Sequence, residues 1–176
     1  RKPEYLSPSN IKLYFSKPEE WYIRYMSDYK VPRWPQTKPM SIGSAFDANV
    51  KSYLHQVIFG KGNDPQFELQ TLFEAQVEPH NRSWAWDQGR EAFRIYKELG
   101  SLNDLLLELN AAIGKPRFEI DIQGIVKGKI RDVVLLGKPD VYFLNKAGHS
   151  VILDWKVNGW CSKSPVSPAK GYIQLR

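Results

Sequence analysis

The sequence predicts one domain of the α+β or mixed α/β class, and three observations lead to this prediction. The chain has 176 residues, of which 42% are hydrophobic, so it is long enough to bury a core of its own. Apolar residues recur at helical spacing up to about residue 113, and from residue 117 onward they alternate with polar residues as in strands. Helices followed by a run of strands are typical of α+β or mixed α/β domains.

The helical half has clear start signals. Ser7 can cap a helix with its side chain, and Pro8 suits the first helical position, where the missing N–H would have no partner in the helix. Pro18 marks a second helix start after a break at Lys17. A loop with three prolines is expected over residues 27–40, because no steady period runs through it. The remaining helices are predicted at residues 44–58, 67–77, 84–99 and 102–113.

The strands are predicted at residues 117–122 and 131–136 and in a final hairpin formed by residues 141–144 and 150–157. A register symmetric about Ala147 pairs Tyr142 with Ile152 and Asp140 with Asp154. The two carboxylates then face each other with their Cβ atoms roughly 5 Å apart. Lys156 follows Asp154 by two residues and points the same way.

Two opposed carboxylates destabilise a sheet unless a cation compensates for them. Mg²⁺ or Mn²⁺ suits a pair of hard oxygen ligands, and Lys156 would then hold a bound water. The alternative is a solvated hairpin face on which Asp154 pairs with Lys156, or Asp140 with Lys138. The hairpin residues by themselves leave both interpretations open.

The composition of the chain restricts its partners and its cellular compartment. The formal charge of +6 favours anionic partners, of which nucleic acid is the commonest. A single cysteine, Cys161, excludes an internal disulfide and a cysteine-cluster metal site, which fits a reducing compartment. No apolar run approaches the roughly 20 residues that span a bilayer, so we expect a soluble, cytoplasmic protein without membrane contact. The last residues look like the start of a helix, and we expect further residues beyond Arg176.

Pro139-Asp140 and the later Asp154-Trp155-Lys156 resemble the signature of the PD-(D/E)XK nucleases, and the flanking glycines resemble its RecB-like exonuclease branch. Three further stretches, in the expected order, resemble the same branch: "SPSNIKLYFSKPEEWYIRYM", "GSAFDANV" and "GYIQLR". The resemblance implies a restriction-endonuclease-like core, with a central mixed β-sheet and an antiparallel hairpin flanked by helices. It covers residues 1–176 as a single nuclease domain, with a helical part at 1–113 and the sheet core at 114–176.

The resemblance also implies roles for individual residues. The implied catalytic residues are Lys156, Asp140, Asp154 and Gln174, and the implied metal ligands are Asp47, Asp140, Asp154 and the backbone carbonyl of Trp155. Asp47 stands where the family usually has histidine. Its alternative role is that of an acidic residue in the first turn of a helix, where the helix dipole favours it. The tyrosine that accompanies Gln174 in the family would lie past Arg176.

The function that follows is a Mg²⁺- or Mn²⁺-dependent DNA nuclease, an exonuclease of recombination, repair or phage DNA processing. No iron-sulfur cluster is expected, because lysine stands at position 17 where some relatives have a cluster cysteine. Two alternatives stay open: an inactive nuclease-like module that binds DNA or a protein partner, and a structural domain whose charge is incidental. The candidate DNA contacts lie in the proline-rich loop and are Lys30, Arg33, Trp34 and Lys38. The alternative is a solvated loop whose tryptophan packs on the core.

Overall fold

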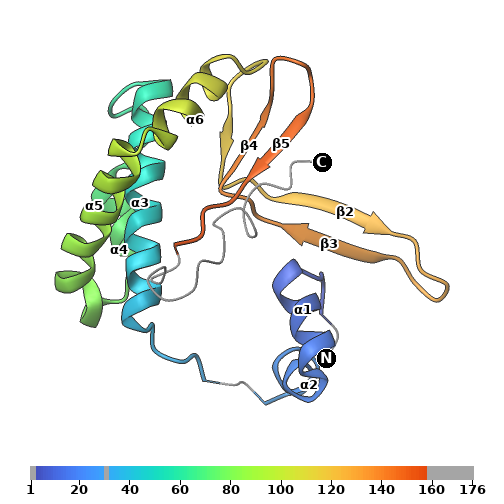
Figure 1. Ribbon diagram of the computed structural model, residues 1–176. Coiled ribbons are helices and arrows are strands. Elements are labelled where there is room, and N and C mark those ends of the chain that lie inside the picture. The colour runs from blue at the N-terminus through green and yellow to red at the C-terminus, as the bar shows by residue number, and fades with distance from the viewer. Residues whose placement is uncertain (1–2, 30–31, 158–176) are drawn as a thin grey trace. The chain divides into compact units, whose positions relative to one another are not determined.

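The computed structural model describes residues 3–29 and 32–157 of the chain. These residues form a mixed α and β structure with six α-helices and five short strands (Figure 1), so the predicted class is confirmed. The chain divides into two compact units. The small unit comprises Arg1–Trp34 and Glu119–Pro139, and the main unit comprises Pro35–Phe118 and Asp140–Arg176. The single nuclease domain stays a prediction.

The helices of the main unit differ from the prediction chiefly where the first one starts. This helix begins at Lys38, within the expected loop, because the Thr37 side chain accepts a hydrogen bond from the Met40 amide and Pro39 lies in the first turn. Short 3₁₀ turns precede the next two helices. The four helices are α3 (Lys38–Phe59), α4 (Leu69–Gln76), α5 (Arg82–Glu98) and α6 (Ser101–Asn110), and the turns are η1 (Pro65–Phe67) and η2 (Pro79–Asn81).

The sheet of the main unit contains the predicted hairpin. Its strands are antiparallel in the order β1 (Arg117–Phe118), β4 (Val141–Leu144) and β5 (Ser150–Leu153). Tyr142 pairs with Ile152, so the register is confirmed within the strands, whereas the predicted pair of Asp140 and Asp154 falls just outside them, because β4 begins at Val141 and β5 ends at Leu153. The turn is fixed by Asn145, whose side chain accepts hydrogen bonds from the amides of residues 147 and 149. The second strand is shorter than predicted, since it ends at Leu153.

The core of the main unit lies between its helices and this sheet (Figure 1). Val50 and Leu54 of α3, Leu102 of α6 and Val141 of β4 have no exposed surface. Burial of each such side chain contributes roughly 1.5–3 kcal/mol. These contacts hold α3 against the start of β4, which is the region where the predicted acidic residues lie.

The small unit combines a helical hairpin with a β-hairpin. Its elements are α1 (Pro8–Ser16), α2 (Pro18–Tyr25), β2 (Ile122–Val126) and β3 (Val133–Gly137). Leu6 forms a bridge with β3, because its amide donates to Val134 at 2.8 Å and its carbonyl accepts from Leu136 at 2.8 Å. The next residue, Ser7, caps α1 as predicted. The bridge therefore ties the start of α1 to β3.

The predicted strand over residues 117–122 is interrupted in the structure. Glu119 has a φ of 52°, in the left-handed region that side chains other than glycine seldom adopt. The chain consequently forms two short strands, β1 and β2, which pair in different sheets. In the described residues both sheets are small and antiparallel, in place of the single central mixed sheet that was expected.

Residues 3–29 and 32–157 include no helix with both the length and the apolar character needed to cross a membrane.

Helices α3 and α5 cross at a point where a glycine is required. A Cβ atom on Gly89 would lie 2.4 Å from the Cβ of Ala45 and 2.9 Å from its carbonyl carbon. Real Cβ atoms do not approach so closely, and the obstructing atoms belong to a buried residue that cannot move aside without separating the helices.

We predict that Gly89→Ala lowers the free energy of unfolding by about 1–3 kcal/mol, as overpacking of a core does. Urea unfolding followed by circular dichroism measures it. Gly43→Ala in α3 is the matched control, because its Cβ would meet nothing within 4 Å and it should gain about 0.5–1 kcal/mol from helix propensity. Equal stability of Gly89→Ala and wild type would contradict the close crossing.

Candidate metal centre

Two of the predicted ligands, Asp47 and Asp140, converge on a single buried lysine. Asp47 and Lys51 lie one turn apart on α3, and Asp140 directly precedes β4. The Nζ atom of Lys51 lies 2.7 Å from Oδ2 of Asp47 and 2.8 Å from Oδ1 of Asp140. The side chain of Lys51 is only 2% exposed, and that of Asp140 is 14% exposed. An ammonium can be buried to this degree because both carboxylates compensate for it.

Each carboxylate is also held by a neutral donor. The side-chain amide of Gln76, in the last turn of α4, donates to Oδ2 of Asp47 at 2.9 Å. The backbone amide of Trp155, after β5, donates to Oδ2 of Asp140 at 2.7 Å. These bonds fix the orientation of both carboxylates, so the site is organised by four separate segments of the main unit.

The electrostatic balance of the site is visible in the pKa of Asp140. Burial and the nearby charge of Asp47 raise this pKa, while the hydrogen bonds and charge from Lys51 and the amide of Trp155 lower it, and the result is about 6. One oxygen of Asp47 lies within 4.8 Å of one oxygen of Asp140. With both carboxylates ionised, the pair and Lys51 carry a net charge of −1, which favours a cation of higher charge.

Asp47 and Asp140, both of the main unit, offer carboxylate oxygens that lie close enough together to share one metal ion. Glu119 is the first residue of the returning segment of the small unit. The carboxylate of Glu119 pairs with Lys138 at 3.1 Å. The geometry of the centre is therefore that of Asp47 and Asp140.

Asp154 and Lys156 lie differently from the two inner carboxylates. Asp154 is 46% exposed and forms an ion pair with Lys156, which is the pairing expected of a solvated hairpin face. Trp155 between them contacts Asp140 through its amide, while the resemblance implied a role for its carbonyl. Asp154 and Lys156 thus lie on either side of Trp155, whose backbone amide contacts the centre.

The predicted DNA contacts lie in the segment before α3 and at the start of that helix. Lys30 lies outside the described residues, as does Gln174, which was predicted as a catalytic residue. Trp34 is 79% exposed, so its ring is not packed on the core. Lys38 begins α3, and its ammonium lies 5.3 Å from the centre of the Trp84 ring. Arg33 has an exposed side chain in the segment before α3.

Sequence reasoning missed Lys51, although the sequence contains a signal for it. The spacing Asp47-x-x-x-Lys51 places a carboxylate and an ammonium on one side of a helix, and Val50 and Leu54 show that the neighbouring side is buried. Such a pair is usually a solvated one. The contact that distinguishes this pair is with Asp140, which lies 89 residues from Lys51 in the sequence.

Comparisons of the chain with protein-family models, curated proteins and solved structures gave no match. The family resemblance accordingly rests on the sequence motifs, and the description of the centre rests on the contacts of Asp47, Lys51 and Asp140.

We predict opposite shifts of the pKa of Asp140 in two variants. Lys51→Met should raise it further above about 6, because the cation that favours ionisation is removed. Asp47→Asn should lower it, because the like charge is removed. Carboxyl ¹³C NMR titration of the folded variants measures both shifts. Lys61→Met, in the exposed loop after α3, is the control and should leave the pKa of Asp140 unchanged; a fall in Lys51→Met would refute the assignment.

Proposed function

We propose that the protein is a metal-dependent DNA nuclease with a restriction-endonuclease-like core, acting as an exonuclease in DNA recombination, repair or phage DNA processing. The observation that carries this proposal is the convergence of Asp47 and Asp140 on one buried cation. The family resemblance selected Asp47 from a motif far upstream of the hairpin. The contacts of Lys51 connect that residue with the Pro-Asp motif independently of the resemblance.

The donor set fits Mg²⁺ or Mn²⁺. Asp47 and Asp140 offer hard carboxylate oxygens, which these ions prefer, and the ammonium of Lys51 marks a position between them that accepts positive charge. Asp154 and the backbone carbonyl of Trp155 would add further oxygen ligands from the segment after β5. Since like charges repel, a divalent ion held by Asp47 and Asp140 would require Lys51 to move away from them.

Phosphodiester hydrolysis needs an attacking water in line with the departing oxygen and compensation of the growing negative charge. A metal ion held by Asp47 and Asp140 would supply Lewis acidity and would lower the pKa of a coordinated water. Lys156 first exchanges its ion pair with Asp154 for contacts with the substrate. It then orients that water or stabilises the negative charge that develops on the phosphate. Because Trp155 is bonded to Asp140, both side chains are attached to a backbone segment already anchored at the centre.

A second candidate is an inactive nuclease-like module that binds DNA or a protein partner. The observation in its favour is that Lys51 neutralises one of the two negative charges of Asp47 and Asp140, while Asp154 and Lys156 neutralise each other. In such a module Lys51 would be a permanent structural cation, and no divalent ion would be needed.

We predict metal-dependent cleavage of linear DNA that EDTA abolishes, with closed circular DNA resistant if the enzyme requires ends. Asp140→Asn and Lys156→Ala should each lower the rate about 10²–10³-fold, as loss of one transition-state contact does. Gel assays with end-labelled strands in Mg²⁺ or Mn²⁺ measure the rates.

Lys146→Ala is the matched control for this assay, because it removes an exposed lysine from the turn of the same hairpin. Cleavage by Lys156→Ala at the normal rate would overturn the catalytic assignment. DNA binding without product in any metal would favour the inactive module.

A further inference from the structure

The turn of the β2–β3 hairpin in the small unit presents an unusual combination of side chains. Residues 127–132 have the sequence Lys-Gly-Lys-Ile-Arg-Asp. Ile130 is 99% exposed. The turn is closed by an ion pair of 2.8 Å between Lys127 and Asp132. A Cβ atom on Gly128 would lie 2.2 Å from the carbonyl oxygen of Arg131, so the chain can fold back this tightly only with glycine there.

Lys129 and Arg131 differ from the other charged residues of this turn. Asp132 is the one acidic residue of the turn, and its partner is Lys127. Neither Lys129 nor Arg131 makes an ion pair or a hydrogen bond with any residue that the structure describes. Two cations are therefore left available to an anionic ligand.

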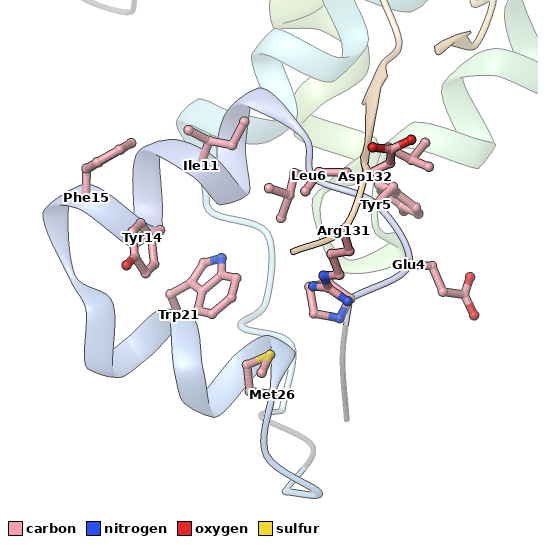
Figure 2. A pocket seen from close by; sticks show the side chains of 13 residues that line it. Glu4, Tyr5, Leu6, Ile11, Tyr14, Phe15, Trp21, Met26, Arg131 and Asp132 are labelled. Atoms are coloured by element: carbon pink, nitrogen blue, oxygen red, sulfur yellow. The ribbon is translucent and has the colours of Figure 1, made fainter. Parts of the chain in front are cut away.

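A pocket of about 630 Å³ lies between this turn and the helical hairpin of the same unit. Figure 2 shows Arg131 on one side of it and the aromatic rings of α1 and α2 on the other. The rings of Tyr14 and Trp21 meet edge to face at 5.2 Å. The indole nitrogen of Trp21 is buried and has no hydrogen-bond partner among the described residues. Such a pocket has room for a flat ring that offers hydrogen-bond acceptors.

Exposed aromatic side chains continue beyond the pocket. Tyr5 and Phe15 also line it, and further exposed rings of the small unit belong to Tyr22, Tyr29 and Trp34. At the pocket itself, Tyr5, Tyr14 and Phe15 together expose aromatic surface, and contiguous apolar surface of this kind marks a site for a ligand or partner. Proteins that bind single-stranded nucleic acid combine such rings, on which bases stack, with cations that hold the phosphates.

We propose that the small unit is a binding site for single-stranded DNA, with one base held against Tyr14 and Trp21 and the adjoining phosphates held by Lys129 and Arg131. The choice of DNA rests on the proposed nuclease function, whereas the unpaired bases follow from the pocket, since a paired base cannot enter it. Ile130 at the tip of the turn contacts the neighbouring base. Glu4 also lines the pocket and opposes a phosphate there.

The test is binding of a fluorescently labelled 20-nucleotide poly(dT) strand to the full chain in EDTA, followed by anisotropy at several salt concentrations. Lys129→Gln/Arg131→Gln should bind about tenfold more weakly in low salt. The slope of log K against log salt should be shallower by about 1.4, since each phosphate contact on a single strand contributes about 0.7. Lys61→Gln/Lys146→Gln, which removes two exposed lysines of the main unit, is the charge-matched control and should keep the wild-type slope.

The pocket is tested in the same assay. Tyr14→Ala should weaken binding about five- to tenfold while Tyr14→Phe retains it, because stacking needs the ring and not the hydroxyl. Two competitors should displace the labelled poly(dT) strand poorly. One is a strand of equal length made only of abasic sites, and the other is a duplex of equal length. Glu4→Gln should tighten binding two- to threefold, because an opposing charge is removed.

An unchanged salt slope in Lys129→Gln/Arg131→Gln, or equal competition by the abasic strand, would overturn the proposal. Preferential binding of wild type to phosphatidylserine vesicles over single-stranded DNA would also overturn it. That result would make the apolar and basic tip of the β2–β3 turn a membrane contact. The assay in EDTA requires no cleavage. If the binding tests fail while DNA is still cleaved, the nuclease proposal stands without the single-strand site. If the binding tests succeed while no cleavage is found, the single-strand site stands without the nuclease proposal.

Discussion

The buried ammonium of Lys51, between the carboxylates of Asp47 and Asp140, is the interaction on which the main unit depends most. Moving three charged groups out of water is costly, and it is tolerated because each group finds its partners at hydrogen-bond distance. Removing one member of such a cluster leaves an uncompensated buried charge, which commonly costs 3–5 kcal/mol. The cluster therefore requires α3 and the start of β4 to meet in one arrangement, and the apolar contacts of Val50, Leu54 and Val141 supply the energy that holds them there.

The same interaction connects stability with the proposed chemistry. Gln76 and the amide of Trp155 complete the hydrogen bonds of the two carboxylates, so these oxygens are already oriented. An oriented pair of carboxylates is a suitable frame for a divalent ion, because little conformational freedom remains to be lost when the ion binds. Under the proposed function, replacement of the ammonium by a metal ion would convert a structural centre into a catalytic one. The pKa of Asp140 is about 6, because burial and the charge of Asp47 raise it by more than Lys51 and the amide of Trp155 lower it.

Local features of the fold were predictable from the sequence, and long-range ones were not. Alternation of apolar residues and the turn at Asn145 predicted the hairpin with its register. The start of α3 was missed because Thr37 and Pro39 lie in a stretch whose prolines favoured a loop. The left-handed backbone of Glu119, which separates β1 from β2, has no signal in a residue type that usually avoids it. Within the centre, Asp140 was predicted from the hairpin register as well as the family resemblance, and Asp47 through the resemblance alone. Lys51 required a contact across 89 residues that no local pattern encodes.

Binding of Mn²⁺, measured by electron paramagnetic resonance, tests the shared cation site most directly. If Asp47 and Asp140 form one site whose resident cation is Lys51, then Lys51→Met should bind Mn²⁺ at least about tenfold more tightly than wild type, because the competing charge is gone. Adding Asp47→Asn to that variant should abolish the gain. Folding of each variant is checked by circular dichroism. Unchanged or weaker Mn²⁺ binding in folded Lys51→Met, or a gain that survives Asp47→Asn, would contradict the account.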